Sequence, residues 1–208
     1  MPGFPGSEIA TILPELSLNA SRNLLFGVRF TGADHFSHAA LLTYDAGTMT
    51  YQTLLTSDQS APGSSGANYG LDLVPGSIDD AGDIAFEASS ISVASNAIST
   101  TLYILPSGAL AVVRIVGSRD TPPAACSWCS ASAPSFLNGV VLTGVAVSLV
   151  APQNTFLPAL NARSQVLLSL WGGLFIGSKD GSLALIPTPN SGAVFSRTCK
   201  GDLCPLVS

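Results

Sequence analysis

Three stretches of the chain share one pattern of apolar and polar positions. In each, a proline precedes an apolar residue and an Asx residue, and an apolar run follows a short turn. The Asx residues are Asn19, Asp79 and Asn161. An Asx side chain can accept a hydrogen bond from the backbone two residues on and so start a turn. An almost unbroken apolar run is typical of a strand buried on both faces. The pattern therefore predicts a turn and a buried strand at three places.

The three turns differ at the position that often requires a left-handed backbone. Gly82 adopts positive φ without steric cost, whereas Arg22 and Ser164 hold the same position in the other copies. Further along, apolar segments flank a glycine-containing turn at Gly47, Gly108 and Gly181. Glycine between two apolar runs, and Asp-Gly above all, is a signal for a β-hairpin. Each copy thus predicts a turn, a strand, a connection and a hairpin.

The spacing of these copies predicts how the chain is organised. We expect an all-β fold with about three repeated four-stranded units, arranged as a partial or small β-propeller-like array. A unit of this kind buries its apolar face only by stacking on a neighbour. Residues 1–208 then form a single repeat domain. Its units span approximately residues 8–66, 67–124 and 136–198, with a cysteine-containing insertion near 125–135 and a C-terminal tail at 199–208.

The second copy resembles a known repeat family. The segment DDAGDIAF, starting at Asp79, is similar to the NxxGxxAF-type tandem repeats of bacterial exported and surface proteins. The segment SDQSAPG, starting at Ser57, is similar to the loop that often follows those repeats. The first copy lacks the Gly and the Ala of the motif, and the third lacks the Gly, the Ala and the Phe. The resemblance implies a propeller-like β fold and a surface location, and it implies no catalytic residues.

Charge and hydropathy exclude several classes of partner. Charged residues make up 10% of the chain, the net charge is −5, and the sequence has no cluster of Lys and Arg. Nucleic-acid binding and polybasic membrane attraction therefore lack their electrostatic basis. No apolar run is long enough to predict a transmembrane helix. The N-terminal sequence has no signal-peptide pattern, so we expect either a leader removed earlier or an intracellular protein. The uncharged polar composition favours the first, and with it a secreted or cell-surface location.

The four cysteines form two local pairs, Cys126 with Cys129 and Cys199 with Cys204. Disulfides are the favoured interpretation, because a low-charge repeat protein fits an oxidising compartment. Four thiolates could instead surround one zinc ion. A redox CxxC is the third interpretation, although no βαβ pattern accompanies it.

Two further groups of residues are candidate metal ligands. His35 and His38, beside Asp34, could supply two of the ligands that a metal needs, although two exposed loop histidines are the simpler interpretation. Proton transfer by either histidine would require Asp34 or Asp58 within reach. Asp79, Asp80 and Asp83 could surround calcium, but they lack the spacing of an EF-hand loop, and a turn role explains the Asx in all three copies.

Neither a nucleophile elbow nor a nucleotide-binding motif occurs in the sequence. The sequence therefore predicts no catalytic residue and no cofactor, with calcium and zinc as the candidate ions. We expect a non-enzymatic exported or surface protein, serving structure or adhesion and associating with itself, with a cell-surface or glycan partner as a further expectation. The alternative is a carbohydrate-active enzyme or sugar-binding module with a site on loops near His35, His38 and the acidic turn.

Overall fold

A computed structural model of the protein describes residues 3–64, 66–91, 98–109, 111–121, 135–137, 140–142, 160–170 and 173–186. These residues form an all-β structure without a helix, which confirms the all-β part of the prediction. Within the same ranges no helix is therefore long and apolar enough to cross a membrane.

The strands form three larger antiparallel sheets and one small one, each sheet following the order of the chain. The first sheet contains β1 (Glu8–Leu18), β2 (Asn23–Thr31), β3 (Ser37–Asp45) and β4 (Thr50–Thr56). The second contains β5 (Asn68–Ile78), β6 (Ile84–Ile91), β7 (Ile98–Leu105) and β8 (Val113–Gly117). The third contains β11 (Gln165–Leu170), β12 (Gly173–Ser178) and β13 (Leu183–Leu185), and β9 (Ser135–Leu137) pairs with β10 (Val140–Leu142).

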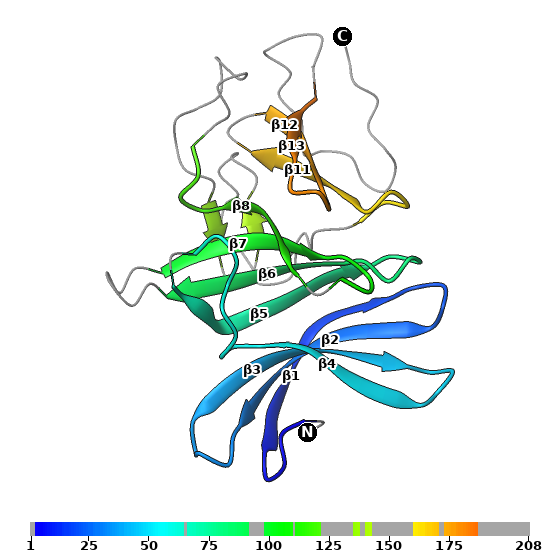
Figure 1. Cartoon of the computed structure of the whole chain (residues 1–208), viewed down its shortest axis with the longest axis vertical. Coiled ribbons are helices and arrows are strands. Elements are labelled where there is room, and N and C mark those ends of the chain that lie inside the picture. Colours follow the sequence, from blue (N-terminus) through cyan, green and yellow to red (C-terminus); the bar gives the residue numbers. More distant parts are fainter. Residues whose placement is uncertain are drawn as a thin grey trace.

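The three larger sheets follow one another along the long axis of the molecule (Figure 1). β5 crosses β1, β2 and β3 of the first sheet, so the first two sheets pack face to face. Gly27 in β2 permits this close approach, because a Cβ there would lie 3.1 Å from the Leu73 carbonyl oxygen and 3.1 Å from Pro75 Cδ. The absence of a side chain at Gly27 thus brings β5 onto the first sheet.

Two apolar cores join the sheets in sequence. The core between the first and second sheets contains buried aliphatic residues of both and three aromatic rings of the second, Tyr69, Phe86 and Tyr103. The core between the second and third sheets combines Leu102 and Ile104 with Val166, Leu168 and other residues. Removing this apolar surface from water is the main favourable term that holds the sheets together.

Three turns have the same backbone conformation: the turn after β1, the turn after β5 and the turn that begins at Asn161. Arg22, Gly82 and Ser164 have φ of 66°, 85° and 57°, so the position that the sequence pattern aligned is left-handed in all three turns. Arg22 and Ser164 adopt this left-handed conformation, which is unfavourable for residues other than Gly, Asn and Asp. The hairpins are less uniform, because φ is positive at Gly108 and Gly181 but, in the first hairpin, at Met49 instead of Gly47.

Candidate functional site

The Asx turns form a polar seam where the first sheet meets the second. The amide Nδ2 of Asn19 donates a hydrogen bond to the backbone oxygen of Asp79 at 2.9 Å, and this contact is buried. Next to it, the backbone N–H of Ile78 donates to Ser17 Oγ at 3.1 Å. The backbone N–H of Ala20 donates to Asp80 Oδ1 at 2.8 Å. The turns therefore do more than reverse the chain, since they bond one sheet to the next.

The seam continues where the second sheet meets the third. The backbone N–H of Leu160 donates to Ser77 Oγ at 2.8 Å, which repeats the bond between Ile78 and Ser17. Asp79 holds the position of Asn19, but its carboxylate has no hydrogen to donate. Here the direction is reversed, and Ser164 Oγ donates to Asp79 Oδ2 at 3.0 Å.

Asp83 adds an ion pair to this second part of the seam. Its side chain is 2% exposed, and Lys179 Nζ lies 2.8 Å from Asp83 Oδ2. The backbone N–H of Ser107 donates to its other oxygen. Burial by itself would raise the pKa of this carboxyl, but the hydrogen bonds and the charge of Lys179 outweigh it and hold the pKa of Asp83 below its usual value. Asp83 is therefore a buried, ionised group that joins the second sheet to the third.

The three aspartates proposed as calcium ligands are thus occupied by protein donors. Asp79 and Asp83 accept hydrogen bonds on both carboxylate oxygens, and Asp80 accepts one from Ala20. No group of three or more metal-ligating side chains converges in the described part of the chain. Sequence reasoning found the Asx turns but missed Ser17 and Ser77, although both stand two residues before the Asx and could have been found by aligning the copies.

The two histidines lie in different surroundings. His35 sits in the β2–β3 turn with a φ of 63°, and its side chain is exposed. His38 stacks on Phe30, and its ring nitrogens are bound on both sides: Nδ1 lies 3.0 Å from Asp58 Oδ2 and Nε2 lies 3.1 Å from Asp34. The hydrogen bond with Asp34, together with the charge of Asp58, raises the pKa of His38 despite its partial burial. Because carboxylates engage both nitrogens, the geometry favours a structural role for His38 over that of a metal ligand or a proton-transfer group.

The face of the first sheet that points away from the second forms an apolar surface. Directly paired residues of adjacent strands project to the same face, and Leu18 pairs with Leu24 while Leu16 pairs with Phe26. The centre of this outer face is a cluster of first-sheet residues with Phe4 packed against it. Its margin is exposed, and the exposed apolar side chains there are Ile9, Ile12, Leu16, Leu18 and Tyr51.

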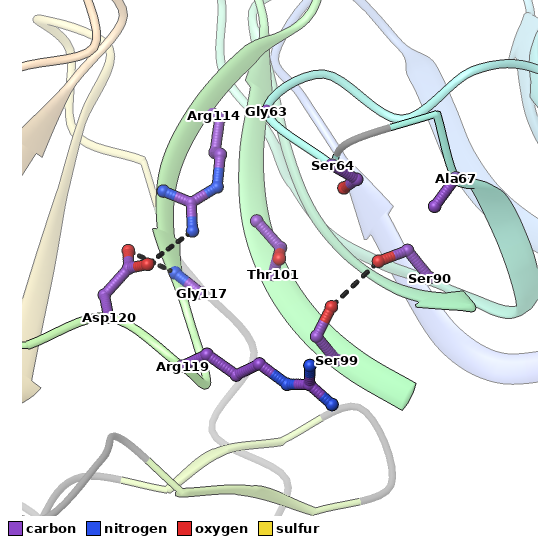
Figure 2. Close-up of a pocket in the computed structure, with 10 residues that line it drawn as sticks. All are labelled: Gly63, Ser64, Ala67, Ser90, Ser99, Thr101, Arg114, Gly117, Arg119 and Asp120. Atoms are coloured by element: carbon purple, nitrogen blue, oxygen red, sulfur yellow. Dashed lines mark hydrogen bonds and ion pairs between the residues drawn. The ribbon is translucent and has the colours of Figure 1, made fainter. Parts of the chain in front are cut away.

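A small polar pocket opens beside β7 and β8 (Figure 2). It has a volume of about 280 Å³, and Ser64, Ser90, Ser99 and Thr101 supply hydroxyl groups to its wall. Both oxygens of Asp120 are occupied, one by Arg114 Nη2 at 2.6 Å and one by the Gly117 N–H at 2.9 Å. Two of the hydroxyls, those of Ser90 and Ser99, hydrogen-bond to each other at 2.9 Å (Figure 2). The pocket therefore offers partly engaged hydroxyls to a small polar ligand, while its carboxylate is already committed to protein donors.

A wider groove of about 980 Å³ lies between the first and second sheets. Tyr69 is the aromatic residue of its wall and Asp45 the carboxylate, and the other lining residues are polar uncharged, aliphatic or glycine. This wall lacks the stacked aromatic rings of a typical sugar-binding groove, and it lacks a pair of carboxylates for glycoside chemistry.

The predicted disulfide residues Cys126, Cys129, Cys199 and Cys204 lie outside the described residues, so their pairing stays a prediction. Comparison with known proteins matched no protein family, no curated protein and no solved structure.

Proposed function

We propose that this protein is a non-catalytic structural or adhesion protein, exported or held at a cell surface, and that copies of it associate. In this proposal the three larger sheets are the repeated units of a small, open, propeller-like array. The observation that carries the proposal is the outer face of the first sheet, which has an exposed apolar margin. Apolar residues gathered on one face of a soluble protein mark an interaction surface more often than chance.

Comparison of equivalent positions supports this interpretation of the outer face. Leu18, Ile78 and Leu160 each precede an Asx residue. Ile78 is 7% exposed because it packs in the core between the first and second sheets, whereas Leu18 is 67% exposed. Ile78 belongs to a face that another sheet covers, so Leu18 belongs to a face whose natural environment is also another protein surface.

Sedimentation velocity over a range of protein concentrations tests the proposal. We expect the sedimentation coefficient of the full chain to rise with concentration in the micromolar range. Added salt should leave this rise intact, because apolar contacts are not screened as charges are. A single monomeric species across the range would contradict the proposal.

The second candidate function is binding of a small hydroxylated ligand such as a sugar. The hydroxyl-lined pocket beside β7 and β8 favours it. A glycan array followed by titration calorimetry tests it, and Thr101→Val in the pocket wall should abolish any binding found. Binding that survives Thr101→Val would place the ligand elsewhere.

A further inference from the structure

Among the described residues, the order of the sheets leaves two unlike faces without a neighbouring sheet. In the first junction, the Phe86 side of the second sheet packs on the Leu25 side of the first sheet. In the second junction, the Leu168 side of the third sheet packs on the Leu102 side of the second. Phe86 and Leu168 hold equivalent positions, so each junction joins the face that carries this position to the opposite face of the preceding sheet. In the part of the chain that the structure describes, one unmatched face belongs to the first sheet and the other to the third sheet.

The exposed fractions of equivalent residues identify both unmatched faces. At the first sheet the marker is Leu18, which is exposed where Ile78 is buried. At the third sheet the marker is Leu167, which follows the turn at the same position as Leu25 and Ala85. Leu25 and Ala85 are 0% exposed, whereas Leu167 is 63% exposed. Ile176 pairs with Leu167, and Ala184 pairs with Ile176, so a row of aliphatic residues crosses this face of the third sheet, with the polar pair Gln165 and Ser178 beside it.

On these grounds we infer that copies of this chain associate head to tail, with the Leu167 face of one copy packed on the Leu18 face of the next. The inference rests on the proposed self-association and specifies its geometry. The partner is a second copy because the chain itself carries both halves of the contact, and the two internal junctions show how such halves fit. A head-to-tail contact that does not close on itself produces a linear polymer.

The polar seam predicts a contact weaker than the internal junctions. Asn161 has the same amide as Asn19. One hydrogen of its Nδ2 is donated to Gln165 Oε1 at 3.2 Å, and the other can be donated to the Asn19 carbonyl of the next copy as Asn19 donates to Asp79. In the sequence, alanine at position 159 aligns with Ser17 and Ser77 and has no hydroxyl, so that bond cannot be repeated. One polar bond and the apolar faces then hold the copies together, which is compatible with reversible assembly.

Complementary variants of the full chain test this geometry. Leu18→Asp blocks one face and Leu167→Asp blocks the other, and both positions are largely exposed, so the folded monomer should tolerate them. Each variant alone should associate roughly a hundredfold or more weakly, because an aspartate buried in an apolar contact has no partner. Mixed in equal amounts, the two variants should form a one-to-one dimer, since each keeps the face that the other has lost. Analytical ultracentrifugation of the separate and mixed samples measures this.

Two controls separate the geometry from folding defects and from general charge effects. Met49→Asp adds the same charge at an exposed turn with a left-handed φ, which aspartate tolerates, and it should assemble like the wild type. Asn161→Asp keeps the Oδ1 atom that accepts the hydrogen bonds of the turn, but it removes the Nδ2 donor. This variant should weaken assembly by about tenfold. Circular dichroism verifies that each variant is folded.

The outcomes distinguish this inference from the proposed function. If Leu18→Asp blocks assembly and Leu167→Asp does not, the contact is head to head and the head-to-tail inference is wrong. If the wild type assembles but neither variant changes it, the inference is wrong while self-association stands. A monomeric wild type would overturn both.

Discussion

The first sheet meets the second at one junction, and the second meets the third at another. The two junctions share one kind of hydrogen bond and differ in the contacts of the Asx side chain. In each, a serine hydroxyl two residues before the Asx accepts a backbone N–H from the following sheet. At the first junction the Asx is Asn19, and its amide donates to a backbone oxygen. At the second junction the Asx is Asp79, and its carboxylate accepts from Ser164 instead.

Two replacements of an amide by a carboxylate, Asn19 by Asp79 and Asn23 by Asp83, change the electrostatics of the second junction. A carboxylate cannot donate as an amide does, so the third sheet has to supply the hydrogen-bond donors. Ser164 supplies one to Asp79, and Lys179 supplies one to the neighbouring Asp83. The first junction is thus held by the buried amide of Asn19 and, at its surface, by the Asp80 carboxylate and an exposed ion pair between Arg29 and Asp72, around an aromatic-rich core. The second junction instead contains a buried ionised carboxylate, Asp83. Two copies of one backbone arrangement consequently respond differently to substitution and to pH.

The largest effect is expected from truncation of the aromatic core of the first junction. Phe86 is fully buried and stacks on Tyr103 with ring centroids 5.3 Å apart. Phe86→Ala should lower the free energy of unfolding by about 3–5 kcal/mol, because it removes apolar burial and leaves a cavity. Leu168→Ala, at the equivalent position of the second junction, should cost about 2–5 kcal/mol. Urea denaturation of both variants measures this, and a cost below 1 kcal/mol for Phe86→Ala would contradict the described core.

A smaller loss is expected when the amide of the first junction becomes a carboxylate. Asn19→Asp should lower the free energy of unfolding by about 1–3 kcal/mol, because a carboxylate oxygen would face the Asp79 carbonyl oxygen with no hydrogen between them. Asn161→Asp is the matched control. Its Oδ1 still accepts from the Arg163 and Gln165 N–H groups, and its effect on the stability of the monomer should stay within about 0.5 kcal/mol. Equal losses in the two variants would remove the buried Asn19 bond as the cause.

The second junction should weaken in acid. Because the pKa of Asp83 is below its usual value in the folded chain, its contribution is present above the unfolded pKa and is lost as the pH falls through the folded pKa. The free energy of unfolding should therefore fall below about pH 4. Asp83→Asn should show a flatter dependence than the wild type in this range. Lys179→Met should also flatten it, because the pKa of Asp83 would then return toward its usual value.

The smallest effect is expected at neutral pH and outside both junctions, at His38. Its pKa is raised, so the stability that it contributes is fully present below about pH 6.5 and is lost as the pH rises through the folded pKa. Thermal unfolding of the wild type should therefore shift to slightly lower temperature as the pH increases above that value. His38→Gln should remove this dependence while leaving the acid dependence of Asp83 unchanged. A neutral-range dependence that persists in His38→Gln would assign it to another group.

The local elements of this fold were accessible from the sequence. The Asx residues, the left-handed positions and the apolar runs act through contacts within a few residues, and each run stands where a strand begins. The aligned position of Arg22, Gly82 and Ser164 predicted one shared turn, and the backbone confirms it. Hairpin signals were equally local, although Met49 shows that a different residue can adopt the left-handed conformation.

The candidate sites depended on tertiary structure, because their partners are far apart in the chain. Nothing local in the sequence places Lys179 beside Asp83 or Asp58 beside His38, since stacking and pairing of whole sheets brings them together. The sequence also predicted the apolar runs as buried on both faces, and this is wrong for the third run, where Val166 and Leu168 are buried but Leu167 is exposed. Leu18 and Ile78 are alike in pattern and differ in exposure because, among the described residues, another sheet packs against Ile78 and none packs against Leu18. Local hydrogen bonding and alternation set the strands, whereas the order of stacking decided which surfaces became cores and which stayed open.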